Sequence, residues 1–376
     1  MHVPARRAGL LLVAGALAAV LTAALLMVAG SAAADSPEPS ADGPLVFGHR
    51  GAAGYRPEHT LASYELGARM GADYIEPDLV STKDGVLVAR HEPEIGGTTD
   101  VADHPEFADR KTTKTVDGTQ LTGWFTEDFT LAELKTLRAK ERLPELRQHN
   151  TLYDGRYEIP TLQEVIDLAK RLSKELHRTI GIAPETKHPT YFRSIGLPLE
   201  PALVRTLKDN GWADRHAPVV IQSFETQNLK ELDKQVDVPL VALLDEKQIV
   251  PADVAAAGGT TTFGDYATPE GLRGLASFAD WVSPWKPYIV PTDDKGEWLA
   301  PTSFIDDAHA AGLKVVAYTF RNENQFLPPS LRSSAVPSDY GNAFAEYLKF
   351  YGLGIDGVFS DNPDTAVAAR TEFLRG

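Results

Sequence analysis

The sequence predicts a (β/α)8 barrel, a closed ring of eight parallel strands with helices between them, with a small inserted subdomain after the second strand. Three observations predict this fold. Eight short apolar runs recur along the chain, helical spacing separates most of them, and polar residues gather at one end of these runs. A doubly wound sheet is the alternative, but such a sheet usually offers a glycine-rich phosphate-binding turn, and the sequence has none.

Residues 1–34 have the pattern of an export signal that is removed from the mature protein. An arginine pair precedes an apolar stretch over 10–29, and three alanines follow. An uncleaved membrane anchor is the alternative, because the apolar stretch is near the length that spans a bilayer. The polar segment 35–43 is expected to be a linker, so the barrel domain is predicted over 44–376. We expect a secreted, extracellular or periplasmic protein without stable membrane insertion after cleavage.

The chain has a formal net charge of −15 and no cysteine. Nucleic acid is not an expected partner, because affinity for its phosphates rests on clustered lysine and arginine. An anionic substrate must therefore be held by a few local cations or by a metal. Without disulfides, the stability of an exported domain has to come from core packing.

The first predicted elements alternate between strand and helix. They are strand 44–48, helix 59–70, strand 74–80 and strand 86–90. Thr60 is the expected N-cap of the helix. Lys83-Asp84-Gly85 forms the turn into the fourth element, an alternating strand that ends at His91.

The alternation stops between residues 94 and about 159. This stretch is polar and rich in turn residues, with one predicted helix over 131–138. We interpret it as an insertion that forms a small lid or subdomain. An inert surface excursion is the alternative.

Alternation then resumes to the end of the chain. The predicted elements are helix 161–172, strands 179–184, 219–223, 239–244, 281–284, 314–320 and 357–360, and helix 365–373. Together with the strands beginning near 45 and 74, these give the eight main strands of the barrel.

Polar residues follow the predicted strands at their carboxyl ends, where the active site of such a barrel lies. They are His49, Arg50, Glu76, Asp78, His91, Glu185, Lys187, Gln222 and Tyr318. A base, an acid, a cation for phosphate and hard oxygen ligands for a metal suit the cleavage of a phosphate ester.

Glu76 and Asp78 are candidate metal ligands. They stand two residues apart on a predicted strand, so both side chains point to the same face. Two carboxylates this close repel each other unless a cation lies between them. Glu185 can complete an all-oxygen site of the kind that Ca²⁺ and Mg²⁺ prefer. A solvated strand face or an ion pair is the alternative for the first two acids.

His49 and His91 are candidate acid–base groups, because each ends a strand that faces the proposed cation and imidazole titrates near neutrality. Arg50 offers a planar fork for phosphate oxygens and Lys187 a point charge. The remaining histidines are assigned as follows: His104, His149, His177, His216 and His309 are expected to be structural, His59 to orient the first loop, and His188 is left open.

Arg50 has an alternative interpretation as a purely structural residue. It could form a salt bridge to Glu58 or Glu76 instead of binding phosphate.

The sequence resembles the glycerophosphodiester phosphodiesterases, particularly their periplasmic or secreted branch. The matching segments are His49-Arg50-Gly51, Pro57-Glu58-His59-Thr60, Glu76-Pro77-Asp78, Lys83-Asp84-Gly85, His91, Pro184-Glu185-Thr186-Lys187, Gln222-Ser223-Phe224, Tyr318-Thr319 and Phe359-Ser360-Asp361-Asn362-Pro363-Asp364. The resemblance covers essentially all of 44–370. The chain departs from the commoner family pattern at His59, where Asn is usual, and at Tyr318, where Trp is usual.

The resemblance implies one divalent cation, Ca²⁺ ahead of Mg²⁺, held by Glu76, Asp78 and Glu185. The other implied site residues are His49 and His91 as catalytic groups, and Arg50, Lys187, Gln222, Phe224 and Tyr318 for substrate binding. The expected reaction converts a glycerophosphodiester to sn-glycerol 3-phosphate and an alcohol, through attack by the glycerol 2-hydroxyl and a cyclic phosphate. His49 is assigned as base and His91 as acid, although the two roles could be exchanged.

Three alternative functions are compatible with the same residues. The enzyme could act on a cell-wall glycerophosphate polymer such as teichoic acid, since the linkage is the same. It could be a phospholipase of the same barrel superfamily, which would need an exposed apolar rim. Such a rim could come from Trp281, Trp285, Trp298 and the aromatic residues near 318–326. A non-catalytic binding protein is the third alternative.

Overall fold

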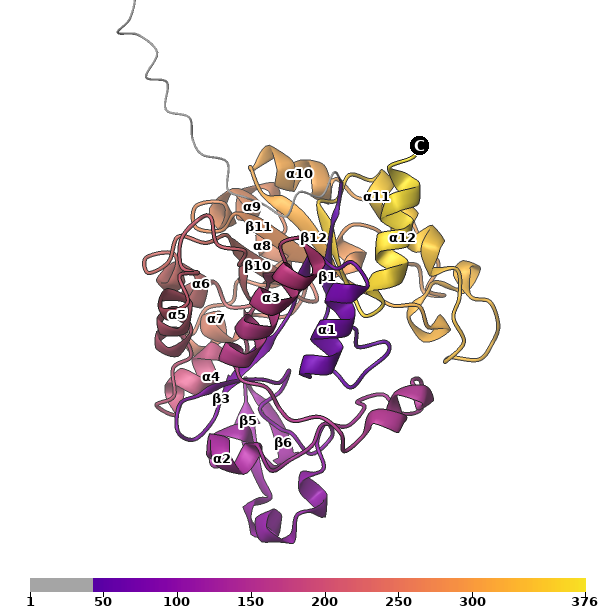
Figure 1. Ribbon diagram of the computed structural model, residues 1–376. Helices are drawn as coiled ribbons and strands as arrows, with labels where there is room; N and C mark the ends of the chain where they lie inside the picture. The colour runs from indigo at the N-terminus through magenta and orange to yellow at the C-terminus, as the bar shows by residue number, and fades with distance from the viewer. Residues whose placement is uncertain (1–42) are drawn as a thin grey trace, which may run out of the picture. The chain divides into compact units, whose positions relative to one another are not determined.

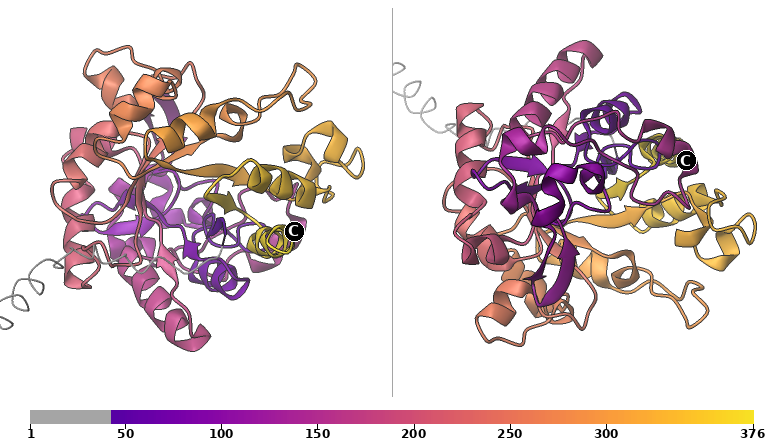
Figure 2. Two further views of the ribbon diagram at one scale, coloured as in Figure 1. Left: turned by 90° about the horizontal axis from the view of Figure 1, so that it is seen from above. Right: turned by 90° about the horizontal axis from the view of Figure 1, so that it is seen from below.

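The computed structural model describes residues 43–376, so the predicted export signal and all but the last residue of the predicted linker lie outside the described residues. Within the described range, no helix combines the length and the apolar character needed to cross a bilayer. Figures 1 and 2 show the helices arranged around the outside of the strands.

The strands of the barrel form one sheet in the order β4-β3-β8-β9-β10-β11-β12-β13-β1-β2-β7. Their bounds are β1 (Leu45–Gly48), β2 (Tyr74–Ile75), β3 (Asp78–Ser81), β4 (Leu87–Ala89), β7 (Gly181–Ile182), β8 (Glu185–Thr186), β9 (Ile221–Ser223), β10 (Leu240–Leu244), β11 (Trp281–Pro284), β12 (Lys314–Phe320) and β13 (Gly357–Ser360). All neighbouring pairs are parallel except β3 and β4.

The ring closes because two barrel positions each hold two short strands in succession. β2 is followed by β3 and β7 by β8, and β2 pairs with β7 just as β3 pairs with β8. An isolated parallel bridge between Ile182 and Val219 joins β7 to the next barrel position. Eight positions in a closed parallel ring therefore confirm the predicted (β/α)8 barrel.

The predicted strands 74–80 and 179–184 are each broken in the structure, and the second pair of short strands extends to Thr186. Pro77 and Pro184 stand in the gaps, and proline has no amide hydrogen to donate to a strand ladder. The prediction of two continuous strands was wrong in this respect.

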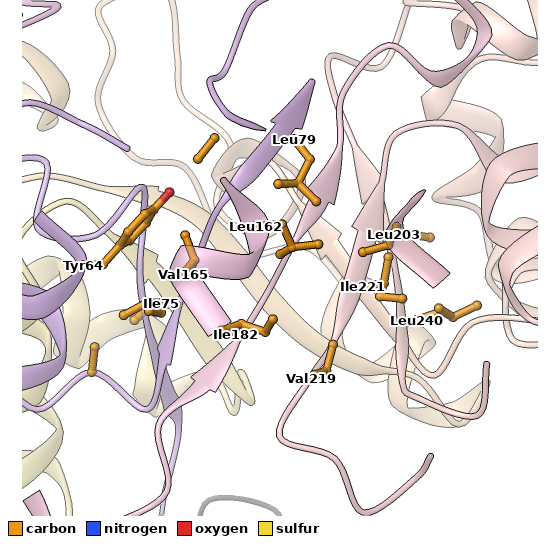
Figure 3. Close-up of a cluster of buried hydrophobic side chains, with 14 of the residues drawn as sticks. Tyr64, Ile75, Leu79, Leu162, Val165, Ile182, Leu203, Val219, Ile221 and Leu240 are labelled. Atoms are coloured by element: carbon orange, nitrogen blue, oxygen red, sulfur yellow. The ribbon is translucent and has the colours of Figure 1, made fainter. Parts of the chain in front are cut away.

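The barrel core has two layers. Nine side chains that fill the interior are Leu45, Phe47, Tyr74, Ala183, Val220, Val241, Trp281, Val316 and Phe359. Phe47 stacks on Tyr74 with ring centroids 4.7 Å apart and meets Trp281 edge-on at 5.9 Å. The second layer lies between strands and helices; Figure 3 shows Ile75, Leu79 and Ile182 in this layer with Leu162 and Val165.

The α-helices of the described chain outside the insertion are α1 (Leu61–Arg69), α3 (Leu162–Leu176), α4 (Pro189–Ser194), α5 (Glu200–Asp209), α6 (Thr226–Leu232), α7 (Ala252–Ala256), α8 (Phe263–Tyr266), α9 (Pro269–Leu275), α10 (Phe304–Ala310), α11 (Ala343–Gly352) and α12 (Pro363–Phe373). Thr60 caps α1 as predicted, because its side chain accepts a hydrogen bond from the amide of Ser63. A capping box between Thr161 and Glu164 begins α3.

The insertion contains a β-hairpin that the sequence analysis missed. Its elements are β5 (Thr112–Val116), β6 (Thr119–Gly123) and α2 (Leu131–Leu134), and the described chain also has 3₁₀ turns at Val101–Asp103, Pro105–Arg110, Thr126–Asp128, Gln148–Tyr153, Lys286–Tyr288, Asn324–Phe326 and Pro329–Leu331. Asp117-Gly118 forms the hairpin turn with positive φ at both residues (46° and 80°), a typical two-residue turn. The predicted helix 131–138 is only the single turn α2.

The insertion packs on the barrel and has no separate core. Phe107, Phe125 and Phe129 belong to the same buried cluster as Val80 and Val88 of the barrel. The hairpin and α2 lie at the lower end of the barrel in Figure 1 and face the viewer in the right-hand view of Figure 2.

The inner layer gives a stability prediction. Phe47→Ala should lower the free energy of unfolding by about 3–5 kcal/mol, because Phe47 is fully buried and its removal leaves a cavity among the other aromatic rings. Leu152→Ala, at a side chain that is 66% exposed, should change it by less than about 0.5 kcal/mol. Denaturant unfolding measures both, and a small effect of the Phe47 variant would contradict the packing described here.

Candidate active site

The carboxyl ends of the barrel strands surround a cavity of about 470 Å³. All ten predicted site residues line it: His49, Arg50, Glu76, Asp78, His91, Glu185, Lys187, Gln222, Phe224 and Tyr318. The five histidines that were expected to be structural do not line it.

Three buried carboxylates meet at the floor of this cavity. Each of Glu76, Asp78 and Glu185 places a carboxylate oxygen within 4.8 Å of those of the other two. Asp78 and Glu185 are direct neighbours in the pairing of β3 with β8, and Glu76 lies in the break between β2 and β3. The prolines that interrupt the strands thus stand directly beside the acids.

Donors from other parts of the chain hold the carboxylates of Glu76 and Glu185. Glu76 accepts from the backbone amide of Arg50 at 2.7 Å and from the side chain of Gln222 at 3.0 Å. Glu185 lies 2.9 Å from the ammonium of Lys187. Since Gln222 contacts Glu76 and the carbonyl of Ala183, the structure places it in support of the carboxylates.

His59 supports the third acid. Its Nε2 lies 2.9 Å from Asp78 Oδ2, and its Nδ1 lies 2.7 Å from the hydroxyl of Tyr64. The residue is fully buried with a positive φ of 54°. The sequence analysis expected His59 to orient the first loop. Its backbone amide does donate to the carbonyl of Arg50 in that loop at 3.1 Å, and its side chain in addition contacts Asp78.

The charge of this trio is unbalanced, and a cation would balance it. Burial, followed by repulsion from the neighbouring acids, raises the pKa of Glu76 well above its ordinary value. Burial raises the pKa of Glu185 to about 8, with Lys187 opposing and Asp78 adding to the shift. Asp78 Oδ1 is buried without a hydrogen-bond partner. An orphaned oxygen among hard donors fits Ca²⁺ or Mg²⁺.

His49 is held by a carboxylate at the end of β1. Its Nδ1 lies 2.5 Å from Asp361 Oδ1, while Asp361 Oδ2 accepts from Arg147 at 2.5 Å and from Arg321 at 2.8 Å. With Nδ1 donating to Asp361, Nε2 of His49 is left with a lone pair that can accept a proton. Burial lowers the pKa of His49 to about 4, against the opposing effect of Asp361.

A carboxylate also holds the second histidine, His91. Its Nδ1 lies 2.5 Å from Glu92 Oε1, and its Nε2 lies 3.2 Å from the ammonium of Lys187. Burial, and then the positive charges of Arg50 and Lys187, lower the pKa of His91 to about 3, although 28% of its side chain is exposed.

The amino-acid sequence of this chain is similar to those of known proteins. The glycerophosphoryl diester phosphodiesterase family matches residues 49–365. A glycerophosphodiester phosphodiesterase of Arabidopsis thaliana, GDPD6, is 36% identical over 331 residues, which cover 85% of this chain and 83% of the relative. The chain belongs to this family. It is therefore an enzyme, a glycerophosphodiester phosphodiesterase, and the predicted family is confirmed.

Further proteins are similar to this chain in sequence or in fold. A glycerophosphodiester phosphodiesterase of Haemophilus influenzae is 28% identical, with coverage of 88% of this chain and 90% of the relative. A solved structure from Silicibacter pomeroyi described as a glycerophosphoryl diester phosphodiesterase has a TM-score of 0.60 at 19% identity, covering 88% and 94% of the two chains. An Oleispira antarctica phosphodiesterase, solved with the product sn-glycerol-3-phosphate, has a TM-score of 0.55 at 22% identity, covering 87% and 96%.

The inserted segment of this family member reaches into the site through two arginines that the sequence analysis missed. Arg142 lies between Glu58 and Glu92, at 2.7 and 2.5 Å, and Glu92 in turn holds His91. Arg147 donates to Asp361, the partner of His49. The polar, irregular sequence around both arginines gave no signal for these contacts.

Asp361 was also missed as a site residue, although it lay in a segment that matched the family. It directly follows β13, as His49 directly follows β1, so the strand-end rule could have identified it.

Arg50 takes part in the ion pair that was its alternative interpretation. Its Nη1 lies 3.0 Å from Glu58 Oε2, whereas Glu76 contacts only its backbone amide. The side chain still lines the cavity, and its buried Nε has no hydrogen-bond partner.

Aromatic side chains form the other wall of the cavity. Phe224 and Tyr318 meet edge-on with ring centroids 6.0 Å apart, and the Tyr318 hydroxyl donates to the carbonyl of Leu244 at 2.9 Å.

The lowered pKa of His49 makes the free energy of unfolding depend on pH. At pH 5 the folded protein keeps His49 neutral, because its pKa is lowered to about 4, whereas an unfolded histidine with a pKa near 6.5 is mostly protonated. The unfolded state then binds more protons, so the free energy of unfolding falls as the pH drops below about 6.5.

His49→Asn should therefore reduce the loss of stability between pH 7.5 and pH 5 by about 2 kcal/mol. Denaturant unfolding with a chelator present at both pH values measures this loss. His309→Asn, which removes a histidine from α10, is the control and should keep the wild-type loss. An undiminished loss in the His49 variant would contradict the assignment.

Proposed function

We propose that the enzyme hydrolyses glycerophosphodiesters to sn-glycerol 3-phosphate and an alcohol, with one divalent cation and two histidines. The observation that carries the proposal is the buried trio of carboxylates in the same cavity as His49 and His91. The names of the relatives support the substrate class, and the product bound to the Oleispira antarctica enzyme is the one proposed here.

Glu76, Asp78 and Glu185 would hold the cation, Ca²⁺ ahead of Mg²⁺. When bound, it would supply positive charge beside the phosphate oxygens, where negative charge develops in the reaction. Arg50 and Lys187 line the same cavity and would neutralise further phosphate oxygens.

His49 would act as the base of the first step. Asp361 keeps the Nδ1 proton in place, so Nε2 can take the proton of the glycerol 2-hydroxyl. The hydroxyl oxygen then bonds to phosphorus, and the bond from phosphorus to the leaving alcohol breaks. His91 gives its proton to the departing oxygen. It must be cationic for this step, and Glu92 at Nδ1 together with the negative charge of the bound phosphate would favour that form against the effect of burial.

The second step reverses these roles. His91, now neutral, takes a proton from water as the water oxygen attacks the cyclic phosphate. His49 returns its proton to the glycerol 2-oxygen, which yields sn-glycerol 3-phosphate and restores both histidines.

The apolar rim expected of a phospholipase receives little support. Trp281 is only 3% exposed inside the barrel, and Trp298 is partly buried against the core. Trp285 is 39% exposed at the cavity and is the only one of the three that could contact a lipid surface. We therefore favour a water-soluble diester as substrate.

We also propose that the protein is exported and acts outside the cytoplasm, in the periplasm or the medium. The support is the sequence of residues 1–34, with its arginine pair, apolar stretch and alanine-rich end.

The nucleophile can be tested with a modified substrate. Glycerophosphocholine lacking the 2-hydroxyl should bind but release no choline, because no internal nucleophile remains. Choline release and competitive inhibition of the normal substrate measure the two properties. Full-rate cleavage of the 2-deoxy substrate would show that water attacks phosphorus directly.

The acid–base groups can be tested in the same assay. His49→Ala and His91→Ala should each lower kcat by about 10²–10⁴-fold while the proteins stay folded. His309→Ala is the matched control, because this histidine pairs with Asp356 away from the cavity, and it should retain wild-type kcat.

Chelation should abolish turnover reversibly, and Ca²⁺ or Mg²⁺ should restore it. Glu185→Gln should weaken cation binding measured by calorimetry, because it removes one of three carboxylate ligands. Restoration by Zn²⁺ alone, or full activity with a chelator present, would count against the all-oxygen site.

A further inference from the structure

A second chamber of about 750 Å³ adjoins the catalytic cavity, within the usual range for small-molecule sites. Six residues line both spaces: His91, Glu185, Lys187, Phe224, Asp245 and Tyr318. His91 is the group that gives a proton to the leaving alcohol in the proposed function. The chamber therefore lies on the side of the cavity from which that alcohol departs.

The walls of the chamber are acidic. Beyond the catalytic groups, Asp117, Glu225 and Asp245 line it. Among the described residues, Lys187 is the only lysine or arginine in the lining, and its ammonium is already 2.9 Å from Glu185. The hairpin of the insertion supplies Asp117, whose Oδ2 lies 2.5 Å from Nδ1 of His188.

Asp245 is the best-placed of these acids. It directly follows β10, lines both spaces, and has no ion-pair partner within residues 43–376. Burial first, and then the charge of Asp245, raise the pKa of Tyr318 well above its ordinary value, so Asp245 lies near enough to the phenol to act on it. Burial raises the pKa of Glu225 to about 8, and Asp117 adds to the shift, so Glu225 is mostly protonated near pH 7 and contributes a polar group more than a charge.

Aromatic rings and an apolar wall face these acids. Phe224 meets Tyr318 and Phe263 edge-on, with centroids 6.0 and 5.9 Å apart, and the ammonium of Lys187 already lies 5.3 Å from the centroid of the Phe224 ring. The apolar residues of the wall include Ile249, Val250, Pro251, Ala252, Ala255 and Ala256. Aromatic faces beside carboxylates are the groups that bind a methylated or primary ammonium ion.

We propose that this chamber is the subsite for the leaving alcohol and that it binds an organic cation, an amino alcohol such as choline or ethanolamine. The proposal rests on the proposed function and specifies its substrate class. A glycerophosphate polymer would instead place its next phosphate against Asp117 and Asp245 with no free lysine or arginine to receive it.

The effect of the positive charge on the leaving alcohol can be separated from the effect of its shape with a pair of isosteric substrates. Glycerophosphocholine and the glycerophosphodiester of 3,3-dimethylbutanol differ in one atom, the cationic nitrogen or a neutral carbon. The wild-type enzyme should give a kcat/KM about tenfold higher for the choline substrate, since a partly desolvated cation gains about 1–2 kcal/mol from aromatic and carboxylate groups.

Asp245→Asn should lower the ratio of kcat/KM between the choline substrate and its neutral isostere to about threefold or less, mainly by raising KM for the choline substrate. Asp306→Asn, which removes the same charge from an exposed position on α10, is the control and should leave the ratio unchanged. If Asp245→Asn fails to fold, the wild-type comparison of the two isosteres decides the proposal by itself.

Three outcomes separate this proposal from the proposed function. Equal kcat/KM for the two isosteres would overturn the cation subsite and leave the hydrolase in place. A higher kcat/KM for a glycerophosphate trimer than for glycerophosphocholine would overturn it in favour of a polymer substrate. Failure to hydrolyse any of the three would overturn the proposed function and the subsite together.

Discussion

The arrangement of the whole site depends on placing three like charges together where water cannot screen them. Glu76, Asp78 and Glu185 are each at most 5% exposed. Left to themselves, buried carboxylates at this distance repel or take up protons. The barrel counters this by placing at least one donor from elsewhere in the chain on each carboxylate. Oxygens of all three acids lie within 4.8 Å of one another and Oδ1 of Asp78 has no partner, so a cation here would complete the balance.

The histidines follow a related principle. Burial lowers the pKa of both, and each has a carboxylate on Nδ1 that fixes the ring and determines which nitrogen faces the cavity. Arg147 and Arg142 stand behind those carboxylates, and both come from the insertion. The insertion is therefore part of the framework of the site: its arginines hold the carboxylates that contact both histidines, and its hairpin tip forms a wall of the second chamber. An inert surface excursion does not describe it.

The barrel and most of its mouth could be predicted because they depend on local patterns. Apolar runs of strand length identify all eight positions, and a residue that follows such a run lies at the mouth whatever the rest of the chain does. Glu76, Asp78 and Glu185 were predicted to converge on this basis. The strand breaks at Pro77 and Pro184 follow from the missing amide hydrogen of proline. The hairpin turn follows from Asp117-Gly118, a dipeptide that favours two-residue turns. Both signals were present in the sequence and were not used.

Other contacts carry no local signal. Arg142 and Arg147 lie in irregular chain, and their partners Glu58 and Asp361 are far away in the sequence, so only the tertiary fold brings them together. His59 shows the same limit: its proximity to the first loop was evident, but its contact with Asp78 depends on a positive φ and on the hydroxyl of Tyr64.

Anomalous diffraction from crystals containing Mn²⁺, a substitute for the hard divalent cations, tests the central claim most directly. The account predicts one strong peak with an oxygen of each of Glu76, Asp78 and Glu185 at roughly 2.0–2.6 Å. A peak elsewhere in the barrel, or Glu185 turned away from the ion, would contradict it.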